Sequence, residues 1–226
     1  GNIVRVKDAL NHITAYSYDA VGNVLTKTDA MGGIYNLQYD GKGNVISVCN
    51  PLGQVQTMTY NDRNILTSVT NPAGETTKYD YDVVGNLMSI SLPNGNIISY
   101  DYDDANRVIS IDDNIGVIVE YTYDATGNKL SETDGEGRTI NYTYDALNRK
   151  ISETLPSGAI TQYSYDNNSN LLSIVDALGN TTQYTYNSLN LQLSHIDALN
   201  AKTSFEYDAV GNLVKATDAN GNTTTW

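Results

Sequence analysis

Tyrosine recurs every 21 residues along the whole chain, without an insertion or a deletion. The ten positions are Tyr18, Tyr39, Tyr60, Tyr81, Tyr102, Tyr123, Tyr144, Tyr165, Tyr186 and Tyr207, here called the invariant column. A fixed period of this length indicates a repeat architecture, in which each unit packs only against its neighbours. We therefore expect the function to lie in a surface built by many copies rather than in a single catalytic cluster.

A second aromatic column stands two residues before the invariant tyrosine in most repeats. Its members are Tyr16, Tyr79, Tyr100, Tyr121, Tyr142, Tyr163, Tyr184 and Phe205, while Leu37 and Met58 occupy the other two repeats. The residues between the two columns are polar, as Thr122 is between Tyr121 and Tyr123. This strict alternation predicts a half-buried β-strand with an aromatic face and a wet face.

Two turns separate the strands of each repeat. The first turn follows the invariant tyrosine and carries Asp or Asn at its first position and Gly or Asn at its fourth, except for Ser169. The turn residues that we single out are Asp19, Gly22, Asp82, Gly85, Asp124, Gly127, Asp208 and Gly211. The second turn contains all four prolines at its second position and Gly at its fourth, with Asn200 as the exception. Both patterns predict type I turns, and the fourth residue of the first turn is expected to be left-handed.

A second strand lies between the two turns, as in residues 86–91. It carries apolar residues at adjacent positions, which predicts that both of its sides are partly buried. Its middle position is Ser in most repeats, which we interpret as a small residue in a tight contact. We expect each invariant tyrosine to pack on Leu, Ile or Ser of the intervening second strand, with its hydroxyl reaching a polar partner or solvent.

The odd period constrains how the strands connect. Side chains alternate between faces at every residue, so an odd repeat length moves the tyrosine to the other face unless something compensates. We therefore predict one regular β-bulge, or one distinct loop type, in every repeat. The fold class is all-β, with antiparallel β-hairpin repeats of 21 residues that form a curled or spiral sheet.

We expect one domain, an array of about ten repeats over residues 1–226, with partial repeats at 1–15 and 222–226. Both ends fall inside a repeat, so we expect the chain to be a piece of a longer protein. Its net charge of −13 argues against a nucleic-acid partner and an anionic membrane surface, both of which need clustered Lys and Arg. No apolar run is long enough to insert into a membrane.

No motif points to catalysis, a metal or a cofactor. His12 and His195 lie about nine repeats apart, and the Asp-rich turns lack the spacings of calcium-binding loops. Phosphate-binding, zinc and nucleophile-elbow motifs are absent. The single Cys49 is interpreted as a small buried filler. We expect no enzyme activity, no cofactor and no metal.

The pattern Tyr-x-Tyr-Asp-x-x-Gly-Asn-Leu, followed by Asp-x-x-Gly, resembles the YD repeat, also called the Rhs repeat. Residues 79–87 and 205–213 carry it most clearly, and the resemblance extends over the whole chain. Similar repeats build Rhs polymorphic toxins, wall-associated proteins, insecticidal toxin-complex cocoons and teneurins. The resemblance implies a long β-strip that spirals into a hollow shell and, in bacterial members, encloses a toxin. It also implies a secreted or cell-surface location.

Three features depart from that family. There is no Asp-Pro dipeptide for self-cleavage, there is no non-repeat toxin domain, and the repeats are unusually uniform. We therefore expect neither self-cleavage nor toxicity from this chain, and the uniform repeats favour an evenly curved open coil or fibre.

Three functional hypotheses follow. The first is a structural segment of a shell or surface protein that encloses or presents a toxin or other cargo, with other repeats of the same parent chain as partners. The second is an extracellular module whose aromatic and Asp-lined surface binds glycan. The third is a fibre-like repeat that associates end to end through its edge strands.

Overall fold

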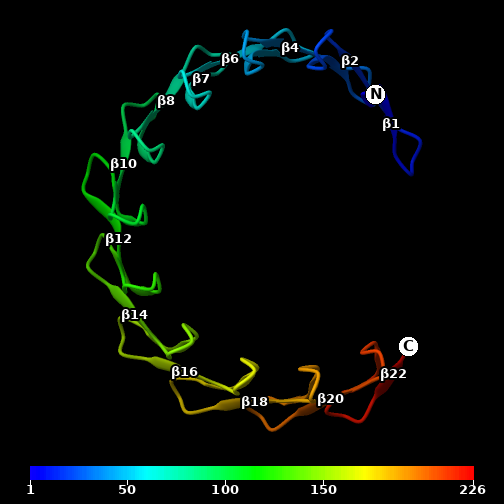
Figure 1. Ribbon diagram of the computed structural model, residues 1–226, viewed down its shortest axis with the longest axis vertical. Helices are drawn as coiled ribbons and strands as arrows, with labels where there is room; N and C mark the ends of the chain where they lie inside the picture. The colour runs from blue at the N-terminus through cyan, green and yellow to red at the C-terminus, as the bar shows by residue number, and fades with distance from the viewer. The chain divides into compact units, whose positions relative to one another are not determined.

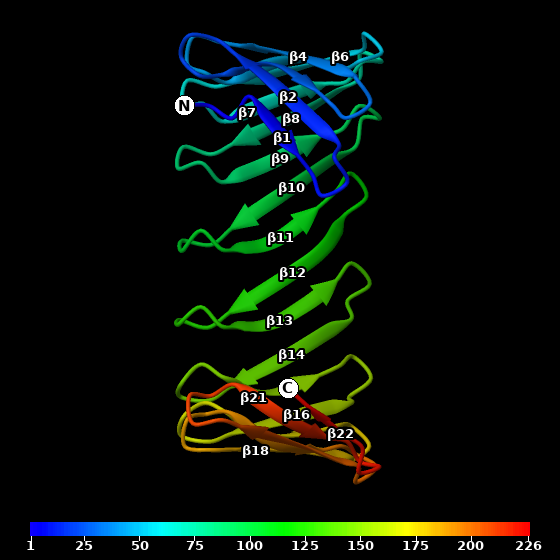
Figure 2. The ribbon, with the colours of Figure 1, turned by 90° about the vertical axis from the view of Figure 1, so that its right-hand side faces the viewer.

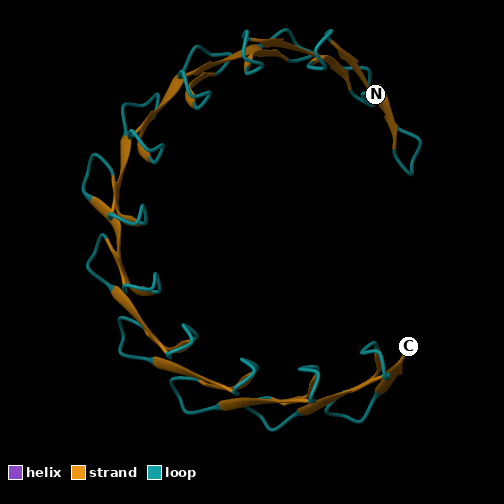
Figure 3. Cartoon of the chain, viewed as in Figure 1, coloured by secondary structure: helices purple, strands orange, loops and turns teal.

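The computed structural model describes residues 1–226 and contains only strands and turns (Figure 3). Because it has no helix, it offers no helical segment that could span a membrane. The strand pairings are antiparallel, so the predicted all-β class is confirmed. The chain divides into two compact units, Gly1–Gly116 and Val117–Trp226, which are described separately. That the repeats of residues 1–226 act as one array stays a prediction.

The first unit holds eleven strands that follow one another as a meander (Figure 1). They are β1 (Arg5–Lys7), β2 (Ile13–Tyr18), β3 (Val24–Thr28), β4 (Ile34–Tyr39), β5 (Val45–Cys49), β6 (Val55–Tyr60), β7 (Leu66–Thr70), β8 (Thr76–Tyr81), β9 (Leu87–Ser91), β10 (Ile97–Tyr102) and β11 (Val108–Asp112). Consecutive strands within the unit pair with each other, because the turns are too short for any other connection.

The second unit repeats the same arrangement. Its strands are β12 (Val117–Tyr123), β13 (Lys129–Asp134), β14 (Thr139–Tyr144), β15 (Lys150–Thr154), β16 (Ile160–Tyr165), β17 (Leu171–Val175), β18 (Thr181–Tyr186), β19 (Gln192–Ile196), β20 (Lys202–Tyr207), β21 (Leu213–Thr217) and β22 (Thr223–Thr225). Within each unit the sheet bends along its length instead of lying flat (Figure 1). The first turns lie along one edge of the sheet and the second turns along the other (Figure 2).

A β-bulge occurs in every repeat, always at the invariant tyrosine. In β2 and β3, Ser17 pairs with Thr26 but Tyr18 pairs with Val24, so Leu25 is the extra residue. The same register shift recurs in all ten repeats. The two turns have equal lengths, as residues 19–23 and 29–33 show. The predicted bulge is therefore confirmed, and the alternative of two loop types is not needed.

Both sides of the second strand are partly buried, as predicted, since every residue of β5 and β7 is half-buried. The bulge changes the reason that the apolar residues are adjacent. These residues do not face opposite sides of the sheet, because both Val24 and Leu25 stand opposite the single Tyr18. Leu25 and its equivalent Ile46 line the same hollow as Tyr39, which places these extra residues on the tyrosine side. The successive side chains of Val24 and Leu25 thus both lie on the tyrosine side of the sheet.

The turns have the predicted backbone. In the first turn of the first repeat, the N–H of Gly22 donates to the Asp19 carbonyl, and Gly22 has a φ of +101°. The fourth position is left-handed in each first turn, including Ser169 at +69°. A non-glycine residue is uncommon in this region unless it is Asn or Asp, so Ser169 is a strained position.

No apolar residue of the chain is buried, and Ser194 is the single residue in the buried class. A one-layer sheet leaves both of its faces open, so side chains are covered only by neighbours in the same layer. Cys49 is accordingly half-buried, and the prediction that it is a buried filler was wrong. Stability therefore depends on strand pairing and on contacts between adjacent repeats.

We expect Ser169→Gly to stabilise the chain by about 0.5–1 kcal/mol, because glycine adopts a positive φ without steric strain. Urea denaturation followed by circular dichroism measures the change. Ser169→Ala is the matched control, since alanine keeps the strain and loses the 3.3 Å contact with Arg149. An alanine variant as stable as the glycine variant would contradict the assignment of strain to this position.

Candidate functional site

The two aromatic columns share one face of the sheet, here called the tyrosine face. Tyr16 and Tyr18 are two residues apart in β2, so they point the same way. Tyr16 pairs with Lys27, and Lys27 pairs with Tyr35 in β4, which carries the face into the next repeat. Tyr39 lies on the same side as Tyr35 within β4. The bulge makes this possible, because it restores the alternation that the odd period would otherwise invert.

The hydroxyl of the invariant tyrosine bonds to the preceding repeat. Tyr39 Oη donates to the Val24 carbonyl at 2.9 Å. Val24 lies in β3 but outside the stretch that pairs with β4, which is Thr26–Thr28. Seven repeats show this bond, at 2.5–3.0 Å, made by Tyr18, Tyr39, Tyr60, Tyr102, Tyr144, Tyr165 and Tyr207. The expected polar partner is thus a backbone carbonyl that strand pairing leaves free. Partial burial raises the pKa of the Tyr39, Tyr102 and Tyr144 hydroxyls above the ordinary value.

The serine column does not pack on the tyrosines. Ser110 pairs with Asp101, the residue between Tyr100 and Tyr102, so it lies on the opposite face. There, the Ser or Thr of the second strand bonds to a hydroxyl of the paired strand at 2.5–2.8 Å. The pairs are Ser17–Thr26, Thr59–Ser68, Thr122–Ser131, Thr143–Ser152, Ser164–Ser173 and Thr185–Ser194. The expectation that tyrosine packs on Ser was therefore wrong, because the bulge displaces Ser to the other side.

In the second unit the tyrosine face carries charged residues among its rings. Lys129 Nζ lies 5.3 Å from the ring centroid of Tyr121 and 5.1 Å from that of Tyr142. Lys150 lies in the same way between Tyr142 and Tyr163. Each ammonium also pairs with a glutamate, as Lys129 does with Glu132 at 2.5 Å. The rings of the second column thus have cations over them, in the geometry of a cation–π interaction.

The aspartates of the first turn accept several hydrogen bonds each. Asp19 Oδ1 accepts from the N–H groups of Val21, Gly22 and Asn23, and its Oδ2 accepts from Asn23 Nδ2. Asp82, Asp124 and Asp208 likewise accept from the N–H and the side-chain amide of the Asn four residues further on. These bonds hold the turn in the conformation in which Gly22 is left-handed, so the aspartates stabilise the shape of the turn.

Hydrogen bonding keeps these carboxyl groups ionised. The side-chain amide of Asn128 and the hydroxyl of Thr126, against the effect of partial burial, lower the pKa of Asp124 to about 2. The Asn212 side chain and N–H lower the pKa of Asp208 in the same way. The charged form is favoured because the donors bind to the carboxylate and not to the protonated acid.

Side chains bridge successive first turns along one edge of each unit. Asn44 Nδ2 donates to Asp40 Oδ2 in its own turn and to Asn64 Oδ1 in the next. Four equivalent bridges occur, in every second repeat, and they are Asn44–Asn64, Asn86–Asn106, Asn128–Asn148 and Asn170–Asn190. Sequence reasoning missed these bridges. The signal is the choice between Gly and Asn at the fourth turn position, because only Asn brings a carboxamide that can reach the preceding turn.

Lys and Arg side chains also link successive first turns along this edge. Arg63 donates to the carbonyls of Asp82 and Val83, and Arg149 donates to the carbonyl of Asp166. Arg63 and Arg149 thus bond to the backbone of the following repeat.

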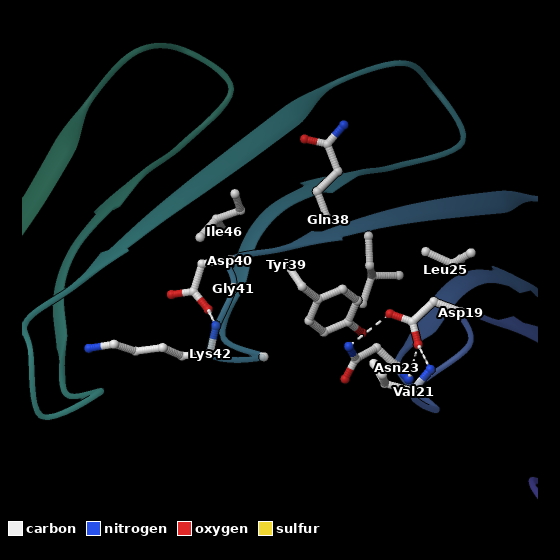
Figure 4. Close-up of a pocket in the computed structure, with 12 residues that line it drawn as sticks. Asp19, Val21, Asn23, Leu25, Gln38, Tyr39, Asp40, Gly41, Lys42 and Ile46 are labelled. Carbon is white, nitrogen blue, oxygen red and sulfur yellow. Dashed lines mark hydrogen bonds between the residues drawn. The ribbon is translucent and has the colours of Figure 1, made fainter.

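A hollow of about 770 Å³ lies between the first turns at residues 19–23 and 40–44 (Figure 4). Leu25, Leu37, Tyr39 and Ile46 form its apolar part, while Asp19, Asn23 and Lys42 stand among its polar residues. Figure 4 shows the Tyr39 ring between the two turns. The hollow is concave but open to solvent, and polar and apolar groups share its surface.

The histidines lie in different units and have different surroundings. His195 lies between Tyr184 and Phe205, with ring centroids 6.3 and 6.1 Å away. His12 Nδ1 is 2.9 Å from Asp8 Oδ2 in an exposed turn. No group of three or more His, Cys, Asp or Glu residues could hold a metal ion.

Comparison with known families and structures agrees with this architecture. The family model described as Teneurin YD-shell matches residues 1–131, which is more than half of the chain. The chain belongs to the YD-shell family. The RHS Repeat model matches four overlapping segments of the same array, at residues 123–160, 144–177, 165–202 and 186–223. No curated protein is a significant relative of this YD-shell chain.

Solved structures with the same fold include TcdB2-TccC3 assemblies and a Tc holotoxin pore. The crystal structure of TcdB2-TccC3 without its hypervariable C-terminal region aligns with a TM-score of 0.60 and 19% identity. TcdB2-TccC3-Cdc42 aligns at 0.58 and 18%, and the Tc holotoxin pore of Photorhabdus luminescens at 0.55 and 20%. Each alignment covers 100% of this YD-shell chain but 16% of the other chain. At this identity the likeness shows the fold.

We expect Tyr102→Phe to destabilise the chain by about 1 kcal/mol, because the Leu87 carbonyl loses its donor. Tyr100→Phe is the matched control in the same strand. Its hydroxyl makes no such bond, so the change should stay within about 0.5 kcal/mol. Thermal or urea unfolding of both variants measures the difference, and equal losses would contradict a structural role for the invariant hydroxyl.

We expect stability to fall on acidification below about pH 4. The carboxyl pKa values of the first turns are lowered on folding, so the unfolded chain takes up protons first as the pH falls. The stabilisation is complete above about pH 5 and is lost as the pH falls through the folded-state pKa, which is about 2 for Asp124.

Urea midpoints measured from neutral to acidic pH test this expectation. Asp124→Asn should be less stable than the wild type at neutral pH, and the difference should shrink on acidification. A difference that is independent of pH would show that ionisation of this carboxyl does not stabilise the turn.

Proposed function

We propose that the chain is a structural segment of a Rhs/YD-type secreted or cell-surface bacterial protein, in which it forms part of the wall of a shell. The wall encloses or presents a toxin or another polypeptide cargo. The chain itself is not an enzyme in this proposal. Its partners are the other repeats of the parent chain and the enclosed cargo.

The observation that carries the proposal is a sheet one layer thick, repeated without interruption and without a core of its own. No apolar residue is buried, and the functional groups of the tyrosine and turn columns are used in contacts between neighbouring repeats. A chain whose repeated side chains bond one repeat to the next forms an extended surface rather than a reactive centre. The alignment with the TccC3-containing structures and the family match support this use.

The glycan-binding and fibre-forming hypotheses stay predictions. The rings of the second column have lysines over them in part of the chain, which reduces the ring surface available to a sugar. A glycan array without hits would remove the first alternative. Sedimentation that stays monomeric at high concentration would remove the second.

The parent protein provides the direct test. We expect its coding sequence to contain further repeats and a non-repeat segment, and we expect that segment to resist added protease inside the intact protein. The same segment, expressed alone, is the control and should be cleaved quickly. Equal cleavage rates for the enclosed and the isolated segment would contradict a shell role.

A further inference from the structure

The hollow between residues 19–23 and 40–44 is a junction that the chain leaves open. At the next junction, Asn44 bonds across to Asn64 and Lys42 bonds to the Asp62 carbonyl. Tyr39 Oη donates to the Val24 carbonyl beside the hollow, but no hydrogen bond joins the turn at residues 19–23 to the turn at residues 40–44. Leu191 closes another glycine junction by contact, since a Cβ on Gly211 would lie 3.6 Å from its Cδ1.

The Asn23 side chain is held in its own turn as Asn44 is, but it makes no hydrogen bond to the next turn. Its Nδ2 donates to Asp19 Oδ2 at 2.9 Å, just as Asn44 Nδ2 donates to Asp40 Oδ2 at 2.8 Å. Asn44 uses its second N–H for the carboxamide oxygen of Asn64. An amide nitrogen has two donors, so Asn23 keeps one N–H, together with its Oδ1, unpaired. Figure 4 shows this oxygen turned away from Asp19.

The position that Asn64 occupies in the next repeat is empty here because the equivalent residue, Gly43, has no side chain. A Cβ placed on Gly43 would meet only Asn23 Oδ1, at 4.0 Å, so the space that Asn64 fills in the next repeat is free here. Gly41 adds no side chain to the same turn, although it also lines the hollow. The surrounding residues Leu25, Leu37 and Ile46 provide apolar walls, and Tyr39 provides an aromatic surface.

We propose that this hollow is a docking site for a polypeptide segment that presents an asparagine or glutamine carboxamide. The carboxamide oxygen accepts the free N–H of Asn23, and its amino group donates to Asn23 Oδ1. The stem of the side chain and its neighbours lie against Leu25, Tyr39 and Ile46.

Other junctions of the chain show which chemical group fits this position. Asn residues fill the equivalent position at four other junctions, each with its Oδ1 2.8–3.1 Å from the Nδ2 of the preceding Asn. The hollow is also much larger than one carboxamide, so it admits several residues of a peptide along with it. The carboxylates at its rim already accept hydrogen bonds within their own turns, which favours a neutral partner over a cation.

A titration of the isotopically labelled chain with a capped peptide tests the site. The probe has the sequence of residues 60–66, because Asn64 is the natural occupant of the neighbouring junction. We expect saturable shifts of the Asn23 side-chain amide and of the Gly43 N–H in NMR spectra. A peptide with Gly in place of the second Asn should bind at least about tenfold more weakly.

Gly43→Asn is the decisive variant, because it supplies the missing carboxamide from within the chain. Peptide affinity should fall by at least about tenfold while the circular dichroism spectrum stays unchanged. Gly85→Asn is the matched control, at a left-handed turn position where Ile65 already covers the junction. Its affinity for the peptide should equal that of the wild type.

Three results would overturn the proposal. These are an absence of saturable shifts, unchanged affinity in Gly43→Asn, and shifts of the same resonances by cello- or chito-oligosaccharides but not by the peptide. The last result would assign the hollow to a sugar. Because the titration uses the chain alone, its outcome is independent of whether a longer protein encloses a cargo.

Discussion

The structure depends on one geometric constraint, which is that an odd repeat length must return the same side chains to the same face. Each repeat meets it with a bulge at the invariant tyrosine, where Val24 and Leu25 stand opposite Tyr18. Without the extra residue, every second repeat would present its tyrosines to the opposite side. The bulge therefore keeps the aromatic face continuous and places two residues of the second strand opposite each invariant tyrosine.

A sheet of one layer has no interior, so its stability comes from bonds between adjacent repeats. The tyrosine hydroxyl binds a carbonyl that the ladder leaves free, and the aspartates hold the turns in the shape that lets Asn44 reach Asn64. These bonds are individually modest, but each recurs with the period of the chain. Such additive, nearest-neighbour stability suits a wall, whose length can change without altering the local structure.

Much of this arrangement could be predicted from the sequence, because the period multiplies a weak local signal tenfold. The strands, the turns, the left-handed position of Ser169 and the need for a bulge all follow from residue types at fixed offsets. The face of the serine column could not be predicted, because it depends on which strand contains the extra residue. Likewise, the open junction at Asn23 arises from Asn23 and Gly43, which lie 20 residues apart in successive repeats, and each of them is ordinary in its own turn.

The sequence by itself determined the all-β class, the meander of hairpins and the columns in which tyrosine, aspartate and glycine recur. These properties are local, since they depend on side-chain alternation and on backbone preferences within a few residues. The tertiary structure alone decided which carbonyl each tyrosine hydroxyl binds, which face the serines occupy and which junction stays open. Those outcomes depend on the register between strands, and one extra residue in a strand changes every contact across it.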